Sequence, residues 1–252
     1  MSALVTGMGW LTASGLGQGK RDAFALAPGV LPEVRRQELF EEHPRFGRMD
    51  TYCKAGLAGV VMALRDAGLQ GPLGLDAGLA ASTRAGCLRT DLDYYATVMQ
   101  GHLLASPNLF AFTLPTSFPA EAAICFGLRG PTHVLHEPAA FGLAGVRAAL
   151  EAIDFGEAEI MLAGACEDAP TGWPGLSGED GQTGPAGAVF LVLEAEASAA
   201  KRTAYGRLEL DGETVRLDGA RQESLAALVS GLRNHSTLSA PGANPTGDTS
   251  CA

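Results

Sequence analysis

Residues 130–168, GPTHVLHEPAAFGLAGVRAALEAIDFGEAEIMLAGACED, decide the fold. The segment Thr132–His136 carries apolar residues at its centre, which predicts a strand that enters a core. Pro138 ends this strand, because proline suits the first turn of a following helix. From Ala139 onward small and apolar residues recur at intervals of three and four, which predicts a helix that is buried over most of its surface. The apolar run at 159–163 predicts a second, fully covered strand. This order of elements indicates an α/β fold.

The turn between the first strand and the helix is the place where chemistry is expected. A helix that starts directly after a strand presents unpaired N–H groups and the positive end of its dipole. A cysteine at this turn would have a lowered pKa beside an oxyanion pocket, which makes an acyl-transfer nucleophile. The turn resembles that of β-ketoacyl synthases, where a Gly-Pro pair, a strand, a Thr-Ala-Cys tip and a small-residue helix follow in order. An ungapped alignment from Gly130 to Gly142 places Ala139 at the cysteine position, so the thiol is missing.

Other segments carry the same resemblance. Residues 3–17 are similar to the opening strand and glycine turn of ketosynthases, and residues 45–69 form an amphipathic helix with the family's Arg-Met-Asp start and Asp-Ala-Gly-Leu finish. Residues 106–131 resemble the family's Ser-Pro loop, its small-residue helix and its Gly-Leu-x-Gly-Pro turn, which lie at the dimer interface there. Residues 186–194 match a Gly-Ala-x-x-x-Val-Leu-Glu strand. The matched segments extend over roughly four-fifths of the chain, and their common order is more specific than any single motif.

The resemblance implies a thiolase-like layered α/β fold, of which this chain forms a single N-terminal half with a mixed, mostly parallel sheet covered by helices. We expect this half to comprise residues 1–210. Residues 211–252 should hold a short helix at 222–232 and a mobile Ser/Pro/Gly tail. The family draws its two catalytic histidines from a second half that we do not find in this sequence. With Ala139 at the nucleophile position as well, we expect that the chain is not an enzyme by itself.

The charge and the motifs of the sequence argue against several classes of partner and cofactor. Lys+Arg 18 against Asp+Glu 28 give a net charge of -10, so nucleic acid and anionic membranes are not expected partners. No apolar run is long enough to cross a bilayer and no signal peptide is apparent, which favours a cytoplasmic location. Dinucleotide and phosphate-loop patterns both fail, at Thr12 and at Ser14, and no cofactor is expected. The five cysteines show no metal-ligand spacing, and the adjacent acids Glu167 and Asp168 diverge on any regular element, so we expect no metal site.

A ketosynthase fold without its cysteine resembles a chain-length-factor type subunit, which pairs with an active β-ketoacyl synthase and shapes the tunnel for the growing acyl chain in polyketide or fatty-acid-like synthesis. The apolar helix from Ala139 to Ile153 needs a cover, and a partner subunit would supply it. Because acyl carrier proteins of such systems are acidic, we expect the carrier to dock on the partner and not on this acidic chain. By resemblance, the dimer interface includes Phe112, Thr132, His133, Val134, Leu135 and His136, and the tunnel lining includes Arg84, Cys87, Leu88, Leu92, Leu109 and Phe110.

Two alternatives remain. The chain could be a stand-alone acyl-binding or scaffold homodimer, or an acyl hydrolase or transferase with a relocated nucleophile, for which Cys166 or Cys87 should react with an electrophilic acyl probe. His133 and His136 lie beside the turn, on what we expect to be one face of the strand, and either could act as a base. An interface or core role is the more ordinary interpretation of both. Glu137 is expected to cap the following helix and not to act as a base.

Overall fold

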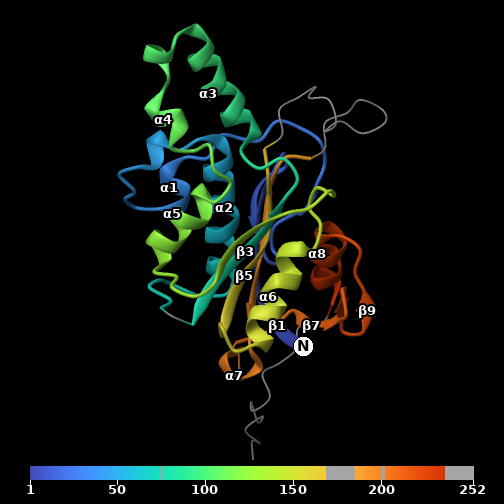
Figure 1. Cartoon of the computed structure of the whole chain (residues 1–252). Helices are drawn as coiled ribbons and strands as arrows, with labels where there is room; N and C mark the ends of the chain where they lie inside the picture. Colours follow the sequence, from blue (N-terminus) through green and yellow to red (C-terminus); the bar gives the residue numbers. More distant parts are fainter. Residues whose placement is uncertain (75, 169–184, 200–201, 236–252) are drawn as a thin grey trace, which may run out of the picture.

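The computed structural model describes residues 1–74, 76–168, 185–199 and 202–235 (Figure 1). The described strands are β1 (Ser2–Thr12), β2 (Gly15–Gln18), β3 (Ala77–Thr83), β4 (Thr132–His136), β5 (Ile160–Glu167), β6 (Gly187–Glu194), β7 (Gly206–Asp211), β8 (Thr214–Leu217) and β9 (Ala220–Arg221). The described helices are α1 (Arg36–Leu39), α2 (Thr51–Asp66), α3 (Leu88–Gln100), α4 (Pro107–Phe110), α5 (Ser117–Phe126), α6 (Ala144–Asp154), α7 (Glu196–Ala199) and α8 (Leu225–Asn234), with short 3-10 turns η1 (Phe46–Arg48) and η2 (His102–Leu104).

The described strands form one mixed sheet in the order β4-β3-β5-β6-β1-β7-β8-β9, with β2 paired to β1. The pairs β4–β3 and β3–β5 are parallel, and the other pairs are antiparallel. The prediction of a mixed sheet covered by helices is confirmed, although its parallel part is smaller than expected. Helices connect β3 to β4 and β4 to β5, and these crossovers are long enough for parallel pairing, whereas the short turns after β1, β7 and β8 impose hairpins.

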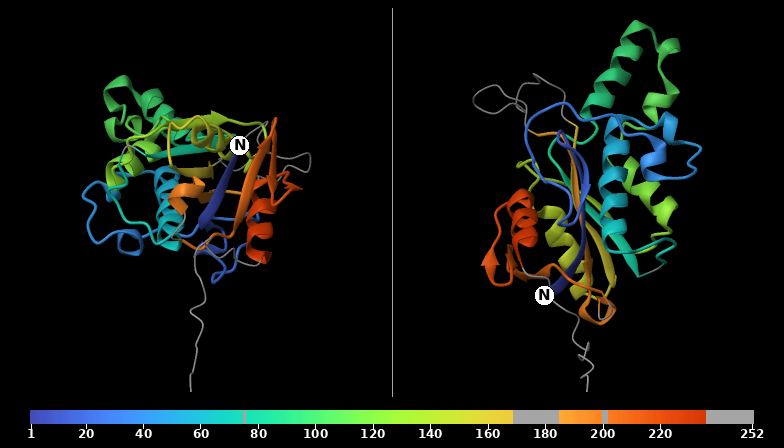
Figure 2. Two further views of the ribbon diagram at one scale, coloured as in Figure 1. Left: turned by 90° about the horizontal axis from the view of Figure 1, so that it is seen from below. Right: turned by 180° about the vertical axis from the view of Figure 1, so that it is seen from behind.

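Helices cover both faces of this sheet. Figure 2 shows α2 and α5 on one face and α6 and α8 on the other. Two glycines let the helices approach closely: a Cβ at Gly9 would lie 2.1 Å from the backbone nitrogen of Ala63 in α2, and one at Gly145 in α6 would lie 2.4 Å from the carbonyl oxygen of Gly164 in β5. Each face therefore carries its own apolar core, with the sheet between them.

The helix predicted at 45–69 is confirmed as η1 followed by α2. Asp50 caps α2 by accepting a hydrogen bond from the Cys53 backbone N–H at 2.8 Å. The apolar residues that make this helix amphipathic are buried: Met49, Tyr52, Cys53, Leu57, Val60, Val61 and Leu64. Gly68, at φ +66°, stands just after the helix end, as expected for a terminating glycine.

The central helix begins later than the sequence suggested. α6 starts at Ala144, and residues 139–143 form a turn in which Phe141 has φ +53°, a left-handed conformation that is uncommon for an aromatic residue. The Phe141 side chain is buried, and its carbonyl accepts a hydrogen bond from the Leu225 N–H at 3.0 Å at the start of α8. The apolar spacing could not reveal this boundary because the turn residues are themselves buried, so they match a helical pattern.

The argument that α6 needs a partner to cover its apolar surface is wrong. Val146, Ala149 and Leu150 are at most 1% exposed, because the sheet covers one side of the helix and the segment from β7 to α8 covers another. Within the described residues this chain buries α6 by itself. Any surface that awaits a partner must be sought elsewhere.

Residues 206–235 continue the same fold. The predicted division between residues 210 and 211 falls inside β7, and β8, β9 and α8 extend the sheet and its apolar core beyond it. The helix expected at 222–232 is observed as α8. The tail predicted to be mobile, residues 236–252, lies outside the described residues.

Two features at the periphery bear on function. Figure 1 shows α3 and α4 extending beyond the body of the sheet. At the opposite end of the strand order from β9, β4 forms an edge of the sheet. Among the helices in the described ranges, none has the length and apolar character required to span a bilayer.

Candidate functional site

The turn that resembles a nucleophile turn lies at the carboxyl end of β4, beside the ends of β3 and β5. Parallel strands place the loops that follow them at one edge of the sheet, where α/β proteins bind their ligands. Ala139 is exposed in this turn and provides only a methyl group. The candidate site is therefore defined by the polar groups around the turn, above all by Glu137.

The Glu137 carboxylate occupies the amino end of α6. One oxygen accepts a hydrogen bond from the Ala144 N–H at 2.9 Å, and the other lies 3.3 Å from the Arg147 guanidinium. Its own backbone N–H donates to the Thr83 carbonyl at 2.9 Å, which fixes the turn to β3. Gly142 permits this arrangement, since a Cβ there would lie 2.3 Å from the carboxylate. Leu143 holds the N-cap position of α6, and the carboxylate of Glu137, six residues before it, carries out the expected capping role.

A second carboxylate, Glu167 at the end of β5, closes the loop after β3. It accepts hydrogen bonds from the Thr83 hydroxyl at 3.2 Å and from the backbone N–H groups of Arg84 at 2.6 Å and Ala85 at 3.2 Å. Burial raises the pKa of Glu167 from 4.5 to about 7, although these three donors oppose the shift. Sequence reasoning missed this role, because nothing in the local pattern shows that Glu167 faces a loop more than eighty residues away in the chain.

This raised pKa predicts a pH-dependent stability. Between pH 4.5 and about 7 the folded state binds more protons at Glu167 than the unfolded state, so the stabilisation by the protonated carboxyl is complete below pH 4.5 and is lost as the pH rises through 7. Glu167→Gln cannot ionise. We expect the unfolding free energy of the wild type, relative to this variant, to fall by about 3 kcal/mol between those pH values. Urea denaturation of both proteins at a series of pH values measures this difference in unfolding free energy.

Glu151→Gln, an exposed carboxylate on α6, is the matched control and should give a much flatter difference. Unfolding free energies of the wild type and Glu167→Gln that stay parallel over the whole pH range would contradict the raised pKa.

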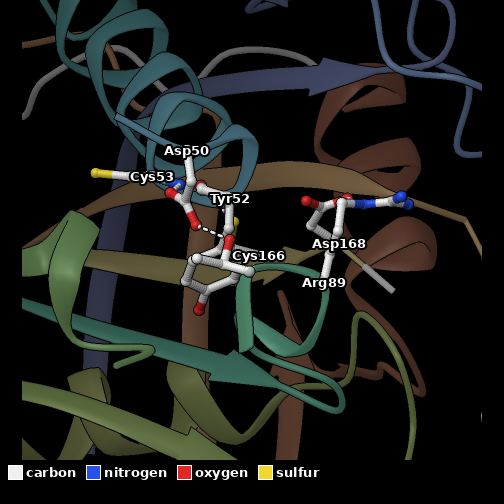
Figure 3. A network of polar contacts seen from close by, with 7 residues as sticks. Asp50, Tyr52, Cys53, Arg89, Cys166 and Asp168 are labelled. Atoms are coloured by element: carbon white, nitrogen blue, oxygen red, sulfur yellow. Dashed lines mark hydrogen bonds and ion pairs between the residues drawn. The ribbon is translucent and has the colours of Figure 1, made fainter. Parts of the chain in front are cut away.

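Polar side chains continue behind this loop, around the amino end of α2 (Figure 3). Asp50 accepts from the Thr90 hydroxyl as well as from the Cys53 N–H, and Asp168 pairs with the Arg89 guanidinium at 3.1 Å. Burial is the largest cause of the raised pKa of both aspartates. Three or more His, Cys, Asp or Glu side chains do not gather into a possible metal site anywhere in the described ranges, so the adjacent acids Glu167 and Asp168 form no such group there.

The cysteines considered as relocated nucleophiles are inaccessible. Cys166 is 0% and Cys87 2% exposed, and burial raises the pKa of both thiols, to about 12 for Cys87. The Cys166 thiol donates to the Tyr52 carbonyl at 3.6 Å (Figure 3). Cys251 lies outside the described residues. These surroundings are typical of inert structural thiols.

The six predicted tunnel residues lie on the loop after β3 and on the two projecting helices. Arg84 and Cys87 belong to the loop, Leu88 and Leu92 to α3, and Leu109 and Phe110 to α4. Phe110 is 60% exposed and packs against Tyr94, with ring centroids 5.4 Å apart. A groove of about 630 Å³ runs nearby between η1, α4 and α5, but none of the six lines it. The tunnel assignment stays a prediction.

The predicted interface residues fall into two groups. Thr132, His133 and His136 are exposed on β4, with Val134 and Leu135 half-buried between them. His133 and His136 are three residues apart, so they project to opposite faces of the strand, and the expectation that they share a face is wrong. Phe112 is half-buried against the α2 core.

The sequence also matches known proteins. Residues 32–179, well over half of the chain, match the family described as "Beta-ketoacyl synthase, N-terminal domain". The chain is 31% identical over 137 residues to "Putative polyketide beta-ketoacyl synthase 1" of Streptomyces virginiae, which covers 46% of this chain and 33% of that protein. It is 36% identical over 134 residues to "Tetracenomycin polyketide synthase ketoacyl synthase alpha subunit" of Streptomyces glaucescens. This match covers 48% of this chain and 31% of that protein. The chain thus spans about a third of the length of these curated relatives.

Solved structures agree with this fold. "The ishigamide ketosynthase/chain length factor" superimposes with a TM-score of 0.64 at 18% identity, covering 82% of this chain and 66% of that one. A beta-ketoacyl synthase from Burkholderia phymatum superimposes with a TM-score of 0.57 at 19% identity, covering 82% of this chain and 62% of that one. At these identities the likeness establishes the thiolase-like ketosynthase architecture alone. The family match at residues 32–179 extends from before α1 to beyond β5, and the chain belongs to the β-ketoacyl synthase N-terminal domain family.

Proposed function

We propose that this chain is a non-catalytic, chain-length-factor type subunit. It pairs with an active β-ketoacyl synthase and shapes the tunnel that holds the growing acyl chain in type II polyketide or fatty-acid-like synthesis. The named relatives include polyketide ketosynthases, and one similar solved structure is titled as a ketosynthase/chain length factor. The proposal transfers that pairing to this chain.

The observation that carries the proposal is the filled amino end of α6. Acyl transfer of the ketosynthase type needs a thiolate beside unpaired N–H groups that receive the developing oxyanion. Here Ala139 provides no thiol, and the Glu137 carboxylate already accepts the Ala144 N–H. A negative charge at this position would oppose both a thiolate and an oxyanion. The Glu137–Arg147 pair therefore favours a structural use of the turn over a catalytic one.

The edge strand β4 supports a partner. The hydrogen bonds from Leu79 N–H to the Pro131 carbonyl and from Glu137 N–H to the Thr83 carbonyl show that odd-numbered residues of this segment face β3. Peptide groups alternate along a strand, so those of Thr132, Val134 and His136 face away from the sheet. Such a row of free backbone groups is a template for strand pairing, which a two-fold or pseudo-two-fold partner would complete.

Exposed apolar side chains on the segment between β3 and β4 support the same conclusion. The projecting helices and α5 expose large apolar side chains that a lone subunit would leave in water: Tyr95 59%, Met99 67%, Leu103 90%, Leu104 61%, Phe110 60%, Leu114 63% and Ile124 64%. Large apolar side chains exposed in such number on one segment are typical of an interaction site. The partner would cover them, and the tunnel would run where the two subunits meet, near the predicted residues of α3 and α4. The net charge of -10 leaves docking of an acidic carrier protein to the partner.

Co-expression tests the proposal directly. We expect that this chain and a cognate active ketosynthase co-purify as a heterodimer, and that condensation of acyl thioesters on a carrier protein requires both, because each supplies part of the tunnel. Product lengths measured by mass spectrometry should shorten when a bulky residue replaces Leu92, since a packed interior does not admit additional volume.

The control is a pair in which the partner's nucleophilic cysteine is replaced by alanine. All condensation should stop, because this chain contributes no nucleophile. Elongation of an acyl thioester by the purified chain alone, or by the pair with the disabled partner, would contradict the proposal.

The second candidate is a scaffold or acyl-binding homodimer. It is favoured by the same edge, since an exposed strand can pair with its own copy about a two-fold axis. Sedimentation of the chain alone discriminates: a stable two-fold dimer that does not exchange with a ketosynthase supports the homodimer, and poor solubility rescued by co-expression supports the heterodimer.

A further inference from the structure

A polar groove lies away from the turn and from the β4 edge. It has a volume of about 470 Å³ and is lined by the end of β2 and the segment after it, the end of α2 and the residue before β7: Gln18, Lys20, Arg21, Arg65, Asp66 and Tyr205. A second hollow of about 290 Å³ shares Arg65, Asp66 and Tyr205 with it and adds Arg202. The two form one continuous polar surface, here called the Tyr205 groove.

Lys20 and Arg65 of the Tyr205 groove form their hydrogen bonds with neutral groups. The Lys20 ammonium donates to the His235 carbonyl and lies 5.6 Å from the centre of the Tyr205 ring. The Arg65 guanidinium donates to the carbonyls of Glu38 and Leu39, each at 2.7 Å. These acceptors are neutral, so neither charge is cancelled by an opposite one there.

Two further groups set the balance of charge. The Arg21 side chain is 75% exposed, and its contact with Asp22 is long, at 3.6 Å. The lining carboxylate, Asp66, has one oxygen engaged by the Met8 N–H at 2.9 Å and the other by the Tyr205 hydroxyl at 3.0 Å. Three cations thus stand against two carboxylates, Asp66 and Asp22, each of which already accepts a backbone hydrogen bond, in a chain whose net charge is -10. The groove has the opposite sign to the molecule as a whole.

The frame that holds these cations is fixed. Gly19 has φ +58°, and a Cβ there would lie 2.2 Å from Asp66, so only glycine lets the turn approach this carboxylate. Its N–H donates to the Met8 carbonyl at 3.0 Å, and its carbonyl accepts from Arg233 at 2.5 Å. A preorganised cluster of cations loses little conformational entropy when an anion binds.

We propose that the Tyr205 groove binds the phosphoryl group of a small phosphorylated ligand. Arginine presents several donors in a fork that matches phosphate oxygens, and Lys20 adds a compact charge. The volume suits a small molecule, and the strongly negative net charge disfavours an extended polyanion such as nucleic acid. The ligand is held between Lys20, Arg21 and Arg65, with the adjoining hollow free to take the non-phosphoryl part.

Calorimetric titration of the full chain, alone or with its partner, tests this. Inorganic pyrophosphate and a nucleoside diphosphate are the two probes. Tighter binding of the nucleoside diphosphate would show that the non-phosphoryl part contributes. We expect saturable binding that weakens as NaCl is added, because exposed charges are screened. The double variant Lys20→Gln/Arg21→Gln should weaken it by about tenfold or more, which corresponds to about 1.4 kcal/mol.

The matched control is Lys54→Gln/Arg216→Gln, which removes the same two charges from α2 and β8. It should bind as the wild type does. If the double variant at position 20 folds poorly, Arg21→Gln alone decides, since this side chain is largely in solvent. Equal weakening in the control, unchanged binding in the groove variants, or no saturation below about 1 mM of either probe would overturn the proposal.

Discussion

Val134→Pro is expected to separate this chain from the proposed ketosynthase partner while leaving its own fold intact. The Val134 peptide group faces away from β3, so proline removes a donor from the free edge of the sheet and spares the bonds to β3. Loss of a buried inter-strand hydrogen bond costs about 1–3 kcal/mol, which weakens association by about tenfold to a hundredfold. The ring also obstructs an approaching strand. Co-purification and partner-dependent condensation should fall together.

The control for this variant is Val30→Pro, in an exposed loop, where the side chain is 92% exposed. Both variants should keep the wild-type circular dichroism and urea midpoint. An intact complex with Val134→Pro would place the interface elsewhere, and the apolar surface around Leu103 and Leu104 would then be the next to test.

Arg202→Met is expected to destabilise the fold by about 3–5 kcal/mol, because it leaves a buried charge without its partner. Glu194, at the end of β6, is 0% exposed and accepts from the Arg202 guanidinium at 2.8 and 2.6 Å and from the Thr6 hydroxyl at 2.6 Å. The three residues join β1 and β6 to the segment before β7. Urea denaturation at a fixed protein concentration measures the loss.

A second variant separates the value of the pair from the penalty of an orphaned charge. Arg202→Met/Glu194→Met removes both charges, and we expect it to recover most of the lost stability, since buried ion pairs are often replaceable by apolar residues. If the single variant costs under about 1 kcal/mol, the pair behaves like one at the surface, and the interpretation of Glu194 as a buried charge fails.

Local sequence patterns identified those elements in which buried and exposed residues alternate with a regular period. The period of α2 and its aspartate and glycine ends are encoded within one stretch, and so are the boundaries of β4. The ungapped alignment over the turn also predicts that Ala139 stands at the family's cysteine position. The start of α6 was misplaced, because burial of Phe141 in a turn and burial on a helix give the same apolar pattern.

The sequence by itself determined the α/β class, the family and the absence of a thiol at the turn, since these rest on the order of residues alone. Only the tertiary structure decided which charges meet. Glu137 fills the amino end of α6, Glu167 holds a loop on another strand, and Lys20 and Arg65 come together beside Tyr205. The tertiary structure also shows that α6, which the sequence suggested was uncovered, is buried. The edge strand β4 and the apolar side chains of the projecting helices are exposed instead. Such contacts join residues far apart in the chain, and their energies depend on burial and distance, which no local pattern encodes.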